Sequence, residues 1–195
     1  MDDLTDPKAA LRSYLQRAHD GLVMNLEGLP ERELRLPRTP TGTNLLGIVK
    51  HVLNCEYGYL GLTFGRPFPT PHELVPLDLF DTDPQADWYA TSDETAEGIL
   101  DLYRRVRAFT DETIDALPLD ARGRVPWWPA ERAEVTLAHV LIRVIDDTSR
   151  HAGQADIIRE HIDGAVGLNP EAPNIPDDVD WPAYVAKLTA IADRF

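Results

Sequence analysis

The chain has 195 residues, 43% of them hydrophobic, and a formal net charge of −14. This length and apolar content predict one globular domain over residues 1–195 and exclude an intrinsically disordered chain. The acidic balance disfavours nucleic-acid partners, because an acidic surface repels phosphate backbones.

The first two predicted helices are amphipathic. The first covers residues 7–27, where leucines recur with helical spacing, and a proline-containing connection follows it. The second covers roughly residues 43–62, and Thr41 or Thr43 can serve as its N-cap. His51 lies at the edge of the apolar face of this second helix.

A long link separates the second helix from the third. Residues 64–91 contain five prolines but carry too much apolar content for a free linker, so we expect the link to fold onto the helices. The third helix is predicted over residues 92–117, with Thr91 and Glu94 at capping-box spacing. A second irregular link follows at residues 118–134.

The fourth predicted helix, Val135 to Gly164, organises the rest of the chain. Its apolar positions alternate in steps of three and four, which is the spacing of one buried helix face. His151 lies on this stripe, Gln154 lies beside it one turn further on, and Asp147 lies one turn back. Polar groups on or beside a buried face are costly unless they hydrogen-bond or bind something.

A coil over residues 165–179 and a short last helix over residues 181–194 complete the prediction. Four long amphipathic helices without clear strand alternation predict an all-α four-helix bundle, with long crossover links and a short C-terminal helix. Bundles of this kind commonly place metal or cofactor sites in the core, on side chains from facing helices.

His51, His151 and Gln154 can converge in such a core from two helices. Two imidazoles and an amide oxygen can bind a divalent metal, with Zn or Ni as the best-suited ions. Asp147 could orient His151 or be a direct ligand, or it could be a solvated charge paired with Arg143. The structural alternative is that these side chains simply hydrogen-bond to one another.

Further polar and aromatic residues are candidates for the same pocket. Cys55 could reach it as a soft ligand or a thiol, although a small buried apolar role is the interpretation that we favour. Glu56 is expected to face outward or join a polar edge network, and His19 has no partner by spacing. Trp127 and Trp128 could wall the pocket mouth, but packing at the bundle end is the favoured interpretation.

Three features of the sequence indicate the cellular compartment of the protein. No apolar run approaches the ~18 residues that span a bilayer, so no membrane association is expected. The N-terminus lacks the basic and apolar regions of a signal peptide. A single cysteine rules out an internal disulfide framework, so the sequence predicts a cytoplasmic protein.

Several stretches of the chain resemble the DinB superfamily, most closely its actinobacterial mini-circle protein branch. They are residues 44–56, 125–128, 134–137 and 150–164. The resemblance implies a four-helix bundle, often dimeric, in which three histidines hold a divalent metal. His51 and His151 match two of these histidines, and Gln154 stands where the resemblance places the third.

Relatives of this fold include thiol-dependent S-transferases and a mycothiol-dependent maleylpyruvate isomerase. The resemblance therefore implies a metal-dependent enzyme that activates a low-molecular-weight thiol for attack on a small electrophile. The alternative is a non-catalytic small-molecule-binding or stress-response bundle that has lost its metal through the change at Gln154. An exposed apolar face on the bundle would favour a homodimer.

Overall fold

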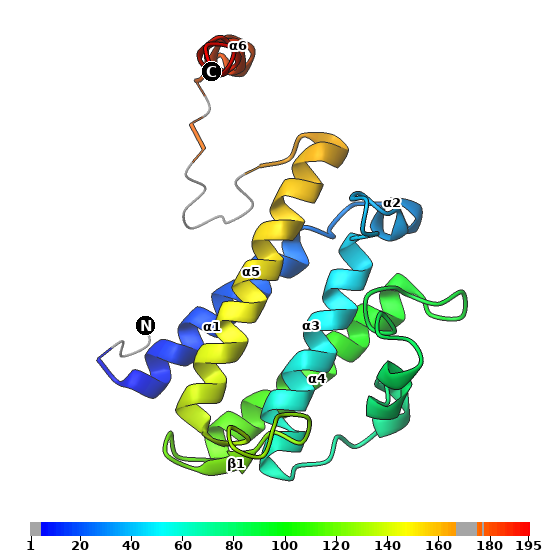
Figure 1. The fold of residues 1–195 in the computed structure, drawn as a ribbon, viewed down its shortest axis with the longest axis vertical. Helices are drawn as coiled ribbons and strands as arrows, with labels where there is room; N and C mark the ends of the chain where they lie inside the picture. The colour runs from blue at the N-terminus through cyan, green and yellow to red at the C-terminus, as the bar shows by residue number, and fades with distance from the viewer. Residues whose placement is uncertain (1–4, 167–174, 177) are drawn as a thin grey trace.

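The protein is described here by a computed structural model covering residues 5–166, 175–176 and 178–195. In this part of the chain, four long helices form a bundle, which confirms the all-α prediction (Figure 1). They are α1 (Pro7–Met24), α3 (Leu45–Leu60), α4 (Ala96–Ala116) and α5 (Leu137–Asp163). Short helices α2 (Glu31–Arg35) and α6 (Trp181–Ala192) accompany them. The predicted coil at 165–179 falls largely outside the described residues.

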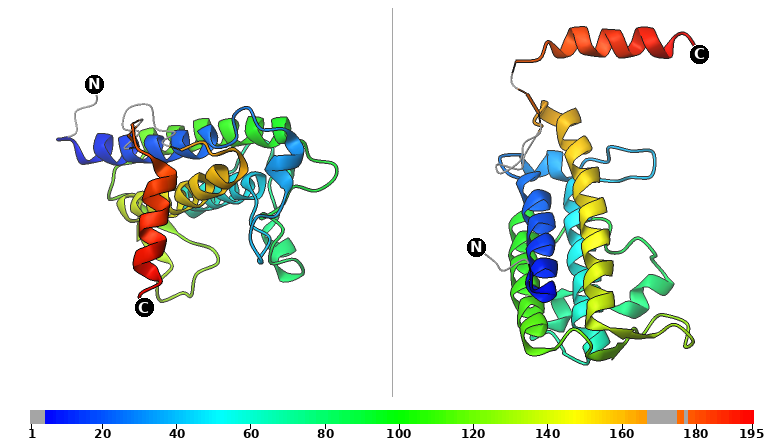
Figure 2. Two further views of the ribbon diagram at one scale, coloured as in Figure 1. Left: turned by 90° about the horizontal axis from the view of Figure 1, so that it is seen from above. Right: turned by 90° about the vertical axis from the view of Figure 1, so that its left-hand side faces the viewer.

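The four helices pack in the order α1, α5, α3, α4, and side chains such as Arg12 and Asp111 join the first and the last of them. Helix α1 packs against α5, α5 against α3, and α3 against α4 (Figure 2). Helices α1 and α4 instead border a groove of about 1250 Å³. The described helices include none that is long and apolar enough to cross a membrane.

The link between α3 and α4 runs back along the bundle, because the two helices point the same way (Figure 1). It contains the 3₁₀ helices η1 (Leu62–Phe64), η2 (Pro71–Glu73) and η3 (Leu77–Asp81). As predicted, the link folds onto the helices, and it buries Phe68 and Leu74 in the core. This position lets the link contribute side chains to the space beside α3.

The link between α4 and α5 turns at one end of the bundle. It does so through an antiparallel hairpin of β1 (Arg122–Arg124) and β2 (Glu134–Thr136), in which Gly123 pairs with Val135. The sequence pattern predicts no strand in this link. Each strand has three residues, which is too short for an alternating pattern to stand out.

Helix starts are set by side chains that satisfy free backbone N–H groups. The Asn44 side chain, rather than Thr41 or Thr43 as predicted, caps α3 by accepting the Gly47 N–H at 2.8 Å. Thr95 caps α4 in the same way, so this helix begins one turn after the predicted capping box. Asn44 is the N-cap of α3 because it directly precedes the first helical residue.

The predicted apolar stripe of α5 is confirmed. Seven of its eight predicted positions, from Leu137 to Ile158 and including Thr148 and His151, are buried, and the eighth, Ile162, is half-buried. The helix ends where predicted, at Gly164, which adopts the left-handed conformation with φ of 76°. Helix α5 therefore carries polar side chains into the core beside α3.

Gly47 marks the point where the link rests directly on α3. A Cβ atom at this position would lie 1.9 Å from the Trp88 carbonyl oxygen. We expect Gly47→Ala to lower the free energy of unfolding by about 1–3 kcal/mol, because the link backbone must move away.

Gly153→Ala is the matched control: nothing lies within 4 Å of its added Cβ. The control should raise stability by up to about 1 kcal/mol. Urea denaturation measures both changes, and an unchanged Gly47→Ala variant would contradict this contact.

Candidate metal centre

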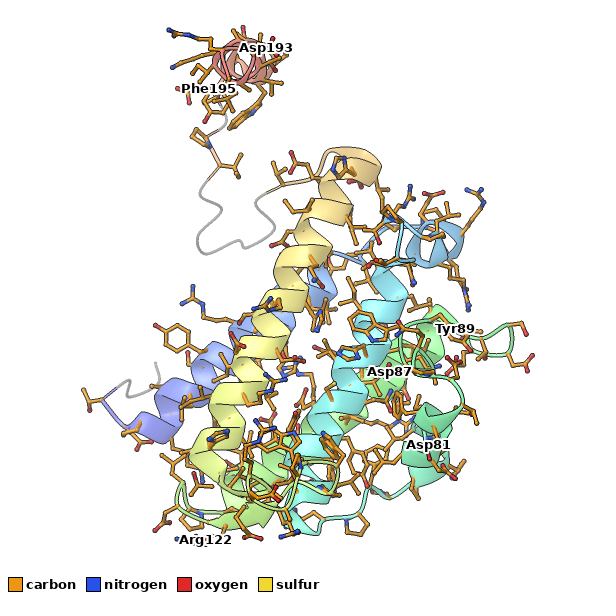
Figure 3. The ribbon with its side chains drawn as sticks, viewed as in Figure 1. Asp81, Asp87, Tyr89, Arg122, Asp193 and Phe195 are labelled. Carbon is orange, nitrogen blue, oxygen red and sulfur yellow. The ribbon has the colours of Figure 1, made fainter. Side chains whose placement is uncertain are left out.

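Three parts of the chain bring polar side chains together beside α3. Helix α3 supplies His51, α5 supplies His151, and the α3–α4 link supplies Asp87 and Trp88 (Figure 3 labels Asp87). The two imidazole ring centroids lie 4.9 Å apart, with the ring planes at 78°. The structure thus places the two histidines singled out in the sequence at one site, between two different helices.

The imidazole of His51 is held by the link. Its Nδ1 lies 2.8 Å from a carboxylate oxygen of Asp87, which can only accept a hydrogen bond when ionised. Nδ1 therefore donates this hydrogen bond, and the other ring nitrogen, Nε2, lies 3.4 Å from the sulfur of Cys55. The Trp88 indole stacks on the same imidazole, with centroids 3.9 Å apart and an angle of 19°. These two contacts fix the orientation of the ring.

His151 is oriented in a parallel way from within its own helix. Its Nδ1 donates to the amide oxygen of Gln154 at 2.8 Å, so its Nε2 is the free nitrogen. This Nε2 lies 3.8 Å from a carboxylate oxygen of Asp147. Burial lowers the pKa of His151, although Gln154 and Asp147 oppose the shift. The ring is therefore held in its neutral form, which is the form that binds metals.

The donor atoms present here fit a divalent metal. One atom each of His51, Asp147 and His151 lie within 4.8 Å of one another. Two neutral imidazoles and a carboxylate are a donor set of catalytic zinc sites, which keep a further position open. The oxygen of Gln154 is engaged by His151, so its geometry is that of an orienting group. A direct ligand role for Gln154 stays a prediction.

Two residues of this centre, Asp87 and Trp88, were not among the predicted site residues. Their only sequence signal is an acid followed by a tryptophan inside an apolar, proline-rich link. Trp88 also borders a small cavity of about 190 Å³ beside the start of α3. Trp127 and Trp128, in contrast, pack on Tyr59, at centroid distances of 5.2 and 6.0 Å.

A second polar cluster lies at the base of the groove between α1 and α4. Of the two alternatives predicted for Glu56, facing outward is wrong because the residue is only 1% exposed, and it instead joins a polar network in the core. One of its carboxylate oxygens lies 3.2 Å from Nε2 of His19, and the other accepts the Thr110 hydroxyl at 2.5 Å. The other nitrogen of His19 contacts the hydroxyl of Tyr103. This cluster ties α1, α3 and α4 together.

The ionisation of Glu56 depends on these partners. Burial by itself would raise the Glu56 pKa, because it penalises the carboxylate. The charge and hydrogen bond of His19, together with Thr110 and Arg107, outweigh burial, so the pKa lies below its ordinary value. Glu56 is therefore ionised at neutral pH, and its charge belongs to a buried, partnered network.

The fold and the donor cluster together define a class of protein: a helical bundle with a candidate metal centre between its helices. Comparison with known families is more specific. The Mycothiol-S-transferase family model matches residues 10–164, and the chain belongs to this family, which is part of the DinB superfamily. The resemblance stated from the sequence is thereby confirmed.

A solved structure shares the fold. The crystal structure of a conserved protein from Enterococcus faecalis is similar, with a TM-score of 0.56 and 17% sequence identity. The match covers 85% of this chain and 99% of that chain. None of the curated proteins that were compared matches the chain. At this identity the structural likeness supports the bundle alone.

Proposed function

We propose that the protein is a divalent-metal-dependent S-transferase that joins mycothiol, a low-molecular-weight thiol, to a small electrophile. The observation that carries this proposal is the cluster of His51, His151 and Asp147 donor atoms within 4.8 Å of one another. Membership of the Mycothiol-S-transferase family supports mycothiol as the thiol.

In this proposal each residue of the centre has a defined task. His51, His151 and Asp147 hold the metal, and Asp87 and Gln154 keep the imidazoles turned toward it. A bound divalent metal would lower the pKa of the incoming thiol, so that its thiolate is available near neutral pH. In the transfer the thiol proton is lost to solvent, and the thiolate sulfur forms a bond to carbon of the electrophile as that carbon's bond to its leaving group breaks, with chloride leaving in the case of monochlorobimane.

The indole of Trp88 has a separate task at the same centre. It covers one face of His51 and lies 5.3 Å from the ring of His151, between centroids. An aromatic cover of this kind keeps water from that side of the two imidazoles and strengthens the electrostatic interactions beneath it. We infer that substrate reaches the centre from a side that the indole leaves open.

The proposal is tested on untagged protein, because a polyhistidine tag would itself bind metal. We expect about one Zn or Ni per chain by elemental analysis and a rise in melting temperature when the ion is added. We also expect metal-dependent conjugation of mycothiol to monochlorobimane, lost with a chelator and restored by the ion. Protein that binds no metal and gains no stability from Zn or Ni would overturn the proposal and fit the non-catalytic alternative.

Substitutions of Gln154 test whether its side chain orients the imidazole of His151 or binds the metal directly. Gln154→Leu removes the oxygen that accepts from His151, and we expect it to weaken zinc binding by about 10- to 100-fold, as loss of an orienting partner does. Gln154→Glu keeps an acceptor at the same reach and should bind zinc at least as well as the parent protein. Competition titration with a chromogenic chelator measures both variants. Equal affinity of Gln154→Leu and the parent protein would contradict an orienting role.

Further features of the protein are proposed from the sequence. They are a single domain over residues 1–195, a small-molecule ligand, homodimer formation and a cytoplasmic location. The family model ends at residue 164, so α6 lies outside it. The side chains of α6 are not buried in the bundle. Size-exclusion chromatography with light scattering tests the dimer.

A further inference from the structure

A buried ammonium group lies next to the metal centre, and the proposed chemistry does not use it. Lys50 directly precedes His51 on α3, and its side chain is only 7% exposed. Its Nζ donates to the backbone carbonyl oxygen of Tyr89 at 3.0 Å and to a carboxylate oxygen of Glu94 at 2.8 Å. Both partners belong to the part of the α3–α4 link that also carries Asp87 (Figure 3 labels Asp87 and Tyr89).

Residues 87–94 of the link are fastened to α3 at two consecutive positions of the helix. His51 contacts Asp87 at the start of this segment, and Lys50 contacts two residues further along it. Consecutive residues of an α-helix point about 100° apart, so the two side chains reach the segment from different directions. The contacts of Lys50 therefore limit how far Asp87 can move relative to His51.

The partner carboxylate of Lys50 is itself tied to the segment. Burial by itself would raise the Glu94 pKa, but the hydrogen bond and charge of Lys50, together with the Thr91 N–H, outweigh burial, so the pKa lies below its ordinary value. The Thr91 N–H donates to the same Glu94 oxygen at 2.6 Å. Hydrogen bonds to charged groups are roughly twice as strong as neutral ones, so this ionised pair is a firm attachment.

We propose that Lys50 is a positioning residue of the metal centre, which acts by holding Asp87 where it accepts from His51. The effect of Lys50 on metal affinity rests on the proposed function, whereas its effect on residues 87–94 needs no metal. The alternative is that the ion pair of Lys50 contributes to the stability of the fold alone. The two differ in whether loss of Lys50 acts through Asp87.

The first measurement is hydrogen exchange of the metal-free, untagged protein, followed by mass spectrometry. Lys50→Met keeps an unbranched side chain of similar length and removes the ammonium group. Asn44 and Arg35 still donate to backbone carbonyl oxygens of the segment, so the variant should fold. We expect the amides of residues 83–94 to exchange at least about fivefold faster than in the parent protein, because local opening becomes easier.

Lys8→Met is the matched control. The Lys8 ammonium also donates to two backbone carbonyl oxygens, those of Asp115 and Leu117, but it joins α1 to the end of α4. We expect this variant to leave both the exchange of residues 83–94 and the zinc affinity within about twofold of the parent protein.

Zinc affinity, measured by competition with a chromogenic chelator, tests whether Lys50 acts through Asp87. We expect Lys50→Met to weaken zinc binding about tenfold in the parent protein, which is the low end of what loss of an orienting partner costs. In an Asp87→Ala background the same change should cost less than about twofold, because no carboxylate is left to position. A purely structural role would give equal losses in the two backgrounds.

The outcomes separate this inference from the proposed function. Zinc binding by the parent protein with equal losses in the two backgrounds overturns the role of Lys50 and leaves the proposed function intact. Unchanged hydrogen exchange of residues 83–94 in Lys50→Met also overturns that role alone. A parent protein that binds no zinc overturns the proposed function and the positioning role together.

Discussion

Replacing His151 by alanine is expected to lower the zinc affinity of the protein by at least about 100-fold, because a direct ligand should matter more than the orienting groups around it. Conjugation of mycothiol to monochlorobimane should fall to the uncatalysed rate in the same variant. The substitution removes the Nε2 atom that faces Asp147 and leaves only His51 as an imidazole donor. Competition titration and a fluorescence assay measure the two effects.

His161→Ala is the control for this experiment. His161 lies on the same helix but in its last turn, and it is exposed to solvent. Its removal should leave both the zinc affinity and the conjugation rate within about twofold of the parent protein, as expected for a surface site far from the centre. Parent-like zinc binding by His151→Ala would show that the metal, if bound, is held elsewhere.

Replacing Glu56 by alanine is expected to cost about 3–5 kcal/mol of folding free energy, which is the usual result of breaking a buried, partnered charge. The change leaves His19 without its carboxylate partner and leaves the Thr110 hydroxyl with the Arg107 carbonyl oxygen as its remaining acceptor. Urea denaturation at neutral pH measures the loss. Glu112→Ala, an exposed acid on α4, should change stability by less than about 0.5 kcal/mol.

The lowered pKa of Glu56 also predicts how the stability of the fold depends on pH. Because the Glu56 pKa is lower in the folded protein than its ordinary value of 4.5, the carboxylate stabilises the fold above pH 4.5. That contribution is lost as the pH falls through the folded-state pKa, where the proton is taken up. The acid-induced loss of stability should therefore be shallower in Glu56→Ala than in the parent protein. Identical acid profiles would contradict the role of Glu56.

Much of the fold follows from periodicity. A buried face of α5 repeats every three to four residues, and that pattern placed His151 inside the bundle, whereas the glycine after Asp163 marked the helix end. The N-cap of α3 was harder to predict, because Asn44, Thr43 and Thr41 all have side chains that can cap a helix. Only the position of the first helical residue selects among them.

The surroundings of the site could not be read from spacing. Asp87 reaches His51 across 36 residues of sequence, and Glu56 reaches Thr110 across 54. Such pairs depend on how the link crosses the bundle and on which helices become neighbours. Helical periodicity carries no information about either. The same periodicity placed Cys55 one turn from His51, and the structure puts its sulfur 3.4 Å from Nε2 of that histidine.

The route of the α3–α4 link has a consequence for how the protein matures. The groups at the centre come from residues 51, 87 and 147–154, so they meet only after the chain has closed its long return loop. A nascent chain lacks this constellation until α5 has been made and has docked. A metal ion would therefore bind late, after the helices have packed. In zinc fingers, by contrast, metal binding drives folding.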